Sequence, residues 1–288
     1  MTRLAVNGVR LEARAAGTGP PLLLLHGFTG RGASWASHLA AFRRRHRTIV
    51  VDLLGHGRSD APTDPARHAV ECQADDLAAL LARLDAIPAD VLGYSMGARI
   101  ALRLALDHPA AVRRLVLESP SAGIADADER AARRARDDAL AATIERGGIP
   151  AFVDRWEAQP IFTSQVALSP AARRRLRAQR LANRVEGLAA SLRGAGQGIA
   201  HPVGGELGVV HAPALVIAGA LDATGRRRAE AVAVALPDAR FAIVEGSGHA
   251  PHLERPAAFR RLVSAFLDAG AAGAGPEPHR RGADMKEP

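Results

Sequence analysis

The chain has 288 residues, 48% of them apolar, which suits one large α/β domain or two small ones. Its formal net charge is +8, and nearly all of the basic residues are arginines. The arginines are dispersed and accompany no nucleic-acid-binding motif. Their abundance is therefore better explained by composition bias or by a small anionic ligand than by binding to nucleic acid. The chain has no apolar run of about 18 residues and no N-terminal signal-peptide core, so we expect a cytoplasmic protein without a membrane span. Its one cysteine, Cys72, cannot form an internal disulfide framework, and we expect no metal site.

Short apolar runs alternate with helical patterns along most of the chain. Residues 6–15 predict an opening hairpin whose turn is Asn7-Gly8. The continuous apolar runs are typical of strands buried on both faces. They predict strands at 21–25, 48–52, 90–94, 114–118, 214–219 and 241–245, separated by helices that include 73–84, 98–107, 226–236 and 257–269. This alternation predicts a mostly parallel sheet with helices on both faces.

The alternation is interrupted between about residues 119 and 212, where the chain shows helical segments rich in arginine and alanine but no strand pattern. Because this stretch lies between two predicted strands, we expect an insertion that forms a helical cap over the carboxyl edge of the sheet. We therefore predict a core at 1–118 and 213–269 and a cap at 119–212. The tail at 270–288 is rich in Gly, Ala, Pro and charge, which predicts disorder.

The pentapeptide Gly-Tyr-Ser-Met-Gly at 93–97 carries the main functional signal. It joins a predicted strand to a predicted helix, and so sharp a turn forces Ser95 towards unfavourable backbone angles that only small neighbours permit. The alternative is a serine that merely caps the helix. The strand before it and the helix after it favour a nucleophile or base in an enzyme with the α/β-hydrolase fold, whose sheet has eight mostly parallel strands.

The sequence His-Gly-Phe-Thr-Gly at 26–30 follows the first buried strand. In this fold, one oxyanion-hole donor is the backbone N–H after the nucleophile, and the other comes from this early loop. We therefore expect the N–H groups of Met96 and Phe28 to form the oxyanion hole. His26 is expected to be a structural, hydrogen-bonded histidine.

A histidine and an acid follow the last strands. His249 lies on the loop after strand 241–245, where it can exchange a proton with Ser95, and we expect its competitor His252 to have a packing role. Asp222 follows strand 214–219, and its rival Glu118 ends an earlier strand. Asp222 is favoured because it fits the order Ser, Asp, His of this fold.

The sequence also resembles one branch of this superfamily, the 2-succinyl-6-hydroxy-2,4-cyclohexadiene-1-carboxylate synthases of the menaquinone pathway, over roughly residues 20–268. The loop at 26–30 followed by Trp35 and the elbow continued by Arg99 match this branch. The more specific matches lie in the predicted cap: Trp-Glu-Ala-Gln-Pro-Ile-Phe at 156–162 and Leu-Arg-Gly-Ala-Gly at 192–196.

This resemblance implies a lyase that needs no cofactor and eliminates pyruvate from 2-succinyl-5-enolpyruvyl-6-hydroxy-3-cyclohexene-1-carboxylate. Ser95, activated by His249, would act as a base, and arginines would bind the substrate carboxylates. The residues implied in substrate binding lie in or near the matched motifs: Tyr94, Arg99, Arg133, Trp156, Phe162 and Arg180.

Three departures from the family pattern are visible. Ala98 replaces a glycine, Ala-Thr-Gly-Arg at 223–226 stands where the family has Lys-Phe, and 200–208 lacks a tryptophan. The triad alone is equally typical of a carboxylesterase or a C–C-bond hydrolase that uses a Ser95 acyl-enzyme or a Ser95-assisted water. A non-enzymatic scaffold with this fold would not need Ser95, Asp222 and His249 together.

Overall fold

Eight strands form one sheet in the computed structural model, which describes residues 2–269; the predicted tail at 270–288 lies outside these residues. The strand order is β1-β2-β4-β3-β5-β6-β7-β8, in which β2 is antiparallel to both of its neighbours and every pair from β4 to β8 is parallel. The strands are β1 (Thr2–Val6), β2 (Val9–Ala16), β3 (Pro21–Leu25), β4 (Arg47–Val51), β5 (Ala89–Tyr94), β6 (Val112–Glu118), β7 (Ala214–Gly219) and β8 (Ala239–Val244).

The opening hairpin turns where the sequence predicts it. Val6 pairs with Val9, and Asn7 and Gly8 between them have φ angles of 43° and 82°. Two positive φ angles in a two-residue loop match the twist of the flanking strands, which is why Asn-Gly is favoured there. The hairpin starts at Thr2, earlier than the predicted start at residue 6.

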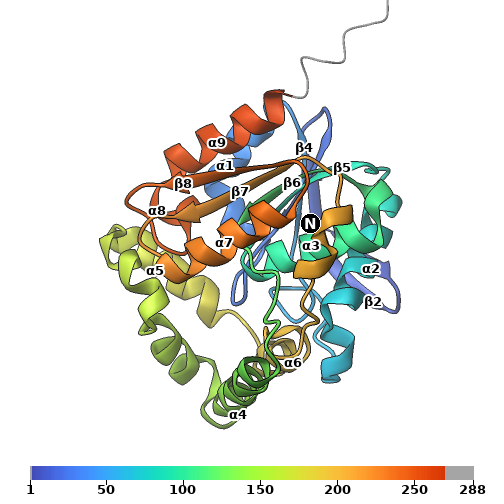
Figure 1. Cartoon of the computed structure of the whole chain (residues 1–288). Coiled ribbons are helices and arrows are strands. Elements are labelled where there is room, and N and C mark those ends of the chain that lie inside the picture. The colour runs from blue at the N-terminus through green and yellow to red at the C-terminus, as the bar shows by residue number, and fades with distance from the viewer. Residues whose placement is uncertain (1, 270–288) are drawn as a thin grey trace, which may run out of the picture.

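Both faces of the sheet are covered (Figure 1). In β3, Leu22 and Leu24 pack into one buried cluster with Phe259, whereas Leu23 and Leu25 pack into another on the opposite face. This burial on both sides explains the continuous apolar runs of the strands. The core helices are α1 (Ala36–Phe42), which the sequence analysis missed, α2 (Val70–Arg83), α3 (Met96–Asp107), α7 (Ala223–Ala235), α8 (Pro251–Glu254) and α9 (Pro256–Ala269).

A helical insertion lies between β6 and β7, on the side of the molecule away from α9 (Figure 1). It has a small core of its own, in which Ile144 and Phe152 pack with Leu188 and Leu192. Its segments are α4 (Ala127–Glu157), η4 (Pro160–Ala167), α5 (Pro170–Leu181), α6 (Val185–Ala195) and η5 (Gly204–Val209). No helix within residues 2–269 is long and apolar enough to cross a membrane.

Candidate active site

Ser95 occupies the sharp turn between β5 and α3. Its φ and ψ of 51° and −106° are unfavourable for a residue with a side chain. A Cβ atom on Gly93 would lie 2.4 Å from the carbonyl oxygen of Gly97, and one on Gly97 would lie 2.5 Å from that of Leu25. Both glycines are therefore required by close backbone contact, which holds the serine at the carboxyl edge of the sheet.

Ser95, His249 and Asp222 form a continuous hydrogen-bonded set. His249 Nε2 lies 3.0 Å from Ser95 Oγ, and His249 Nδ1 lies 2.8 Å from Asp222 Oδ2. The other carboxylate oxygen of Asp222 accepts from the Gly225 N–H at 2.8 Å, which caps α7. Burial disfavours the charge, but the hydrogen bonds with His249 and Gly225 outweigh it and hold the pKa of Asp222 below its ordinary 3.8. An ionised Asp222 keeps the proton of a neutral His249 on Nδ1, so Nε2 can accept one from Ser95.

The loop that carries His249 is anchored on both sides. The Oγ of Ser119, directly after β6, donates to the His249 carbonyl at 2.9 Å. Glu254 accepts from the backbone N–H groups of Gly248 at 2.7 Å and Ala250 at 3.1 Å. The sequence analysis missed both anchors. They hold the imidazole over Ser95 through backbone atoms, which leaves the ring free for proton transfer.

Glu118, the rival acid, is bonded to a different histidine. Its Oε1 accepts from the backbone N–H of His252 at 2.8 Å and lies 2.9 Å from His252 Nδ1, and both residues are buried. The His252 ring packs 4.8 Å from Trp35 and 4.7 Å from Tyr94, measured between ring centroids. This is the packing role expected for His252. Glu118 Oε1 is thereby engaged, Oε2 is buried without a hydrogen-bond partner among the described residues, and neither oxygen is hydrogen-bonded to His249 there.

The loop at 26–30 orients a backbone donor towards the site. The Gly27 carbonyl accepts from the Gly30 N–H at 2.9 Å and from His26 Nδ1 at 2.8 Å. His26 Nε2 accepts from the Leu53 N–H at 3.0 Å, so the ring proton is on Nδ1 and His26 is structural. The C=O and N–H of a trans peptide point in opposite directions, so these bonds also direct the Phe28 N–H. Within residues 2–269, neither the Phe28 N–H nor the Met96 N–H donates to another protein group.

One cavity of about 810 Å³ contains every predicted site residue in its wall. A cavity of this size suits a small organic ligand. Residues that the sequence analysis did not select also line it, among them Arg136, Asp137, Gln165 and Arg228. The predicted residues in the wall are Phe28, Tyr94, Ser95, Met96, Arg99, Arg133, Trp156, Phe162, Arg180, Asp222 and His249.

Arg99 and Arg133 place positive charge on the side of the cavity next to α3 and α4. Arg99 donates to the Ala195 carbonyl at 2.7 Å, and Arg133 Nε donates to Asp137 at 2.9 Å. Burial, with a contribution from the nearby charge of Arg133, lowers the pKa of Arg99 to about 10. Arg99 is therefore still a cation at neutral pH.

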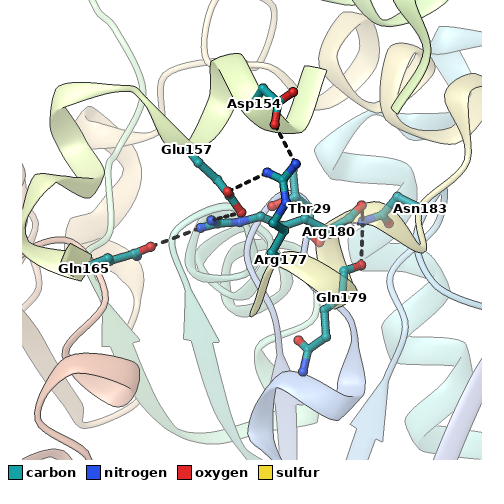
Figure 2. A network of polar contacts seen from close by, with 8 residues as sticks. All are labelled: Thr29, Asp154, Glu157, Gln165, Arg177, Gln179, Arg180 and Asn183. Carbon is teal, nitrogen blue, oxygen red and sulfur yellow. Dashed lines mark hydrogen bonds and ion pairs between the residues drawn. The ribbon is translucent and has the colours of Figure 1, made fainter. Parts of the chain in front are cut away.

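Arg180 also lines the cavity, within a polar network at the end of α5 (Figure 2). It donates to Glu157 at 3.0 Å and to Gln165 at 3.2 Å, and its Cζ lies 5.0 Å from the centroid of Phe162. Arg177 bonds the second oxygen of Glu157 at 2.9 Å. The Arg180 Nε is buried without a hydrogen-bond partner in the described chain. Glu157 belongs to the motif at 156–162, and its pairing with Arg177 and Arg180 could not be predicted from that motif.

These features agree with comparisons to known proteins. Residues 20–256 match the family model of the α/β hydrolase fold. The 2-succinyl-6-hydroxy-2,4-cyclohexadiene-1-carboxylate synthase of Klebsiella pneumoniae (strain 342) is 33% identical over 251 residues, which cover 86% of this chain and 94% of that protein. A Bacillus subtilis (strain 168) protein with a provisional form of the same name is 38% identical over 263 residues, which cover 91% of this chain and 96% of that protein. The chain belongs to this synthase family within the α/β hydrolase fold.

A solved structure of the same group supports the family membership. The structure of MenH from S. aureus superposes with a TM-score of 0.87 at 28% identity, and the match covers 94% of this chain and 100% of that chain. The predicted fold class and the family resemblance are confirmed. The roles of individual residues in this synthase-family chain stay predictions.

Buried neutral histidines beneath the site make acid destabilising. Burial is the main cause that lowers the pKa of His26 to about 4 and of His38 and His56 to about 3, from 6.5. Below pH 6.5 the unfolded chain therefore binds more protons than the folded chain. The free energy of unfolding should fall as the pH drops from 6.5 towards 4, by up to about 1.4 kcal/mol per pH unit for each histidine.

Urea unfolding between pH 7 and pH 5 measures this slope, because carboxylates titrate mostly below that window. His38→Gln should give a shallower slope than the unmodified chain. An unchanged slope in that variant would show that His38 is not neutral in the folded protein.

Proposed function

We propose that the chain eliminates pyruvate from 2-succinyl-5-enolpyruvyl-6-hydroxy-3-cyclohexene-1-carboxylate and releases 2-succinyl-6-hydroxy-2,4-cyclohexadiene-1-carboxylate. The observation that carries the proposal is a single cavity in which the Ser95-His249-Asp222 set lies together with Arg99, Arg133 and Arg180. A serine triad by itself requires only that the bound substrate present a carbonyl group to it. Several cations around it favour a substrate with several carboxylates.

In this mechanism Ser95 is a base. His249 takes the hydroxyl proton of Ser95, and the serine oxygen removes the proton α to the succinyl ketone. The electron pair spreads from the enolate through the ring double bond and breaks the bond between the ring carbon and the enolpyruvyl oxygen. Pyruvate leaves as its enolate, which takes up one proton at its methylene carbon, so that the triad returns to its starting state and no water is consumed.

The free N–H groups of Phe28 and Met96 are proposed to bind the ketone oxygen as it gains negative charge. Preorganised backbone donors stabilise an enolate oxygen by the same electrostatics that stabilise a tetrahedral intermediate. Removing a single donor of this kind typically lowers kcat by about 10²- to 10³-fold. Both donors lie in the wall that contains Ser95, so the base and the oxyanion site can face the same ketone.

The cavity wall supplies the groups that a polycarboxylate needs. Within residues 2–269, the Nε of Arg180 and the indole nitrogen of Trp156 are buried donors without a partner, and buried donors normally have an acceptor. Carboxylate oxygens of the substrate would satisfy them. Burial is the main cause that raises the pKa of Tyr94 well above 10, so its side chain stays a neutral phenol beside the reacting ring. Trp156 and Phe162, with centroids 5.4 Å apart, supply apolar surface for the ring.

The test is pyruvate release. Purified protein mixed with the enolpyruvyl substrate should release one pyruvate per substrate, measured by NADH oxidation with lactate dehydrogenase. The alternative, a carboxylesterase or C–C-bond hydrolase, is checked in parallel with p-nitrophenyl esters. Rapid ester turnover without pyruvate release would refute the lyase and support the hydrolase.

A further inference from the structure

Within residues 2–269, one hydrogen bond joins the turn that presents the Phe28 N–H to the insertion, and Asn183 donates it; the Phe28 ring also packs against Phe152 and Trp156. Asn183 follows α5, is 8% exposed, and donates from Nδ2 to the Thr29 carbonyl at 2.8 Å (Figure 2). The same nitrogen lies 3.1 Å from the Arg180 carbonyl and 3.4 Å from the Gln179 carbonyl. Because all of these neighbours are acceptors, the amide nitrogen rather than its oxygen must occupy this position.

Thr29 has a conformation that needs support. Its φ of 66° is in the left-handed region, which β-branched residues rarely adopt. It is the third residue of the turn closed by the bond from the Gly30 N–H to the Gly27 carbonyl, a position at which positive φ favours glycine. Such a strained conformation persists only where the surrounding structure holds it. The hydrogen bond from Asn183 to the Thr29 carbonyl is a contact of this kind.

The conformation of this turn sets the direction of the oxyanion donor. The Gly27 carbonyl and the Phe28 N–H belong to one planar peptide, so rotation of either rotates both. If Thr29 relaxed to a negative φ, the Gly30 N–H would move away from the Gly27 carbonyl and the peptide plane would lose one of its two restraints. The Phe28 N–H would then no longer point reliably at one place in the cavity.

We propose that Asn183 is a positioning residue that, through Thr29, keeps the Phe28 N–H in its donating orientation only while α5 is packed against the core. This inference rests on the proposed function, in which that N–H binds an enolate oxygen. Arg180 lies on the same last turn of α5, and Gln179 beside it accepts from Ser34 Oγ at 3.0 Å. An anion bound at Arg180 therefore stabilises the same helical turn that holds the oxyanion donor, so substrate capture and enolate stabilisation are coupled.

The first experiment separates catalysis from binding. Asn183→Ala should lower kcat for pyruvate release by about 10- to 100-fold, somewhat less than complete removal of a donor, and change KM by less than about threefold. Asn183→Asp keeps the shape without a donor and should show the same split. Gln179→Ala is the matched control, because it removes the Ser34 bond of the same helix but leaves Thr29 supported. An equal kcat loss in the control would reduce Asn183 to general packing of α5 and overturn the proposal.

A second variant tests the strain directly. Glycine adopts positive φ without cost, so Thr29→Gly should suppress the defect, and the double variant Thr29→Gly/Asn183→Ala should recover at least about tenfold in kcat over Asn183→Ala. No recovery would contradict the role assigned to Thr29.

Amide hydrogen exchange of residues 26–30 supplies a readout that does not depend on the reaction. Exchange should be faster in Asn183→Ala than in the unmodified chain and unchanged in Gln179→Ala. Equal exchange in all three proteins would overturn the proposal. Faster exchange in a protein that releases no pyruvate would instead retain the positioning role and refute only the proposed reaction.

Discussion

Ser95→Ala will lower kcat for pyruvate release by about 10³-fold or more and leave the protein folded, because the proposed mechanism uses the hydroxyl oxygen to remove the substrate proton. Alanine keeps the Cβ atom and the backbone turn, and the elbow is held by close contacts of Gly93 and Gly97 rather than by the hydroxyl. The Ser95 N–H donates to the Glu118 carbonyl at 2.9 Å, and that bond survives the substitution. Steady-state kinetics with a thermal melt of the same preparation measures both effects.

The control for this experiment is a serine of the same cavity. Ser121→Ala removes a hydroxyl that accepts from the Gly123 N–H at 3.2 Å, and it should change kcat only a few-fold. The phosphonylation rate with a fluorophosphonate, measured in the unmodified chain, shows how reactive the Ser95 oxygen is towards an electrophile. If Ser95→Ala retained substantial activity, Ser95 would not be the base and the mechanism would be wrong.

Asp222→Asn should lower kcat by about 10³- to 10⁴-fold. The asparagine oxygen can still accept from the Gly225 N–H, so the cap of α7 is kept. Its amide nitrogen, however, would donate to His249 Nδ1, which moves the ring proton to Nε2. His249 could then no longer accept the proton of Ser95. The loss therefore reports the tautomer of one imidazole rather than loss of structure.

The comparison variant is Glu118→Gln, because Glu118 is the other acid at this edge of the sheet. Its amide oxygen can still accept from the His252 N–H, and it should reduce kcat much less than Asp222→Asn does. A larger loss in Glu118→Gln would reverse the assignment of the catalytic acid. The low pKa of Asp222 also has a stability consequence: its contribution is present above pH 3.8 and is lost as the pH falls through its folded value, and Asp222→Asn should lack this acid-dependent part.

The family placement bears on the chemistry because the same triad geometry serves esterases. In this chain, the wall around the triad carries several arginines. Arg99 is half-buried and still cationic at neutral pH, and the Arg180 Nε is a buried donor without a partner among the described residues. Glu157 already pairs with the Arg180 guanidinium, but a buried donor left without an acceptor is costly, so this wall is more stable when a ligand supplies an acceptor. A neutral ester would leave these groups unsatisfied, which is why we favour the polycarboxylate lyase.

The core fold and the position of the site follow from local patterns. Continuous apolar runs such as 21–25 can be satisfied only by a strand covered on both faces, and a parallel sheet places the carboxyl ends of its strands on one edge. Ser95 and Asp222 follow such strands, and His249 follows the parallel edge strand β8, whose residues are mostly part-buried or exposed, so their meeting at one edge could be predicted without coordinates. The site residues in the cap were predicted from the resemblance of their motifs rather than from periodicity, and they too line the cavity.

Strand order alone does not decide which acid pairs with which histidine. Glu118 ends β6 and Asp222 follows the adjacent β7, whereas His249 lies just before α8 and His252 lies within it, so strand order alone allows either acid to pair with either histidine. The packing of side chains selects the pairs. The Thr29–Asn183 bond joins residues 154 positions apart, on a core loop and on the insertion. The local sequence pattern determines which helix or strand each segment forms. These long-range contacts depend instead on how the core and the insertion pack against each other. That packing sets the final geometry of the site.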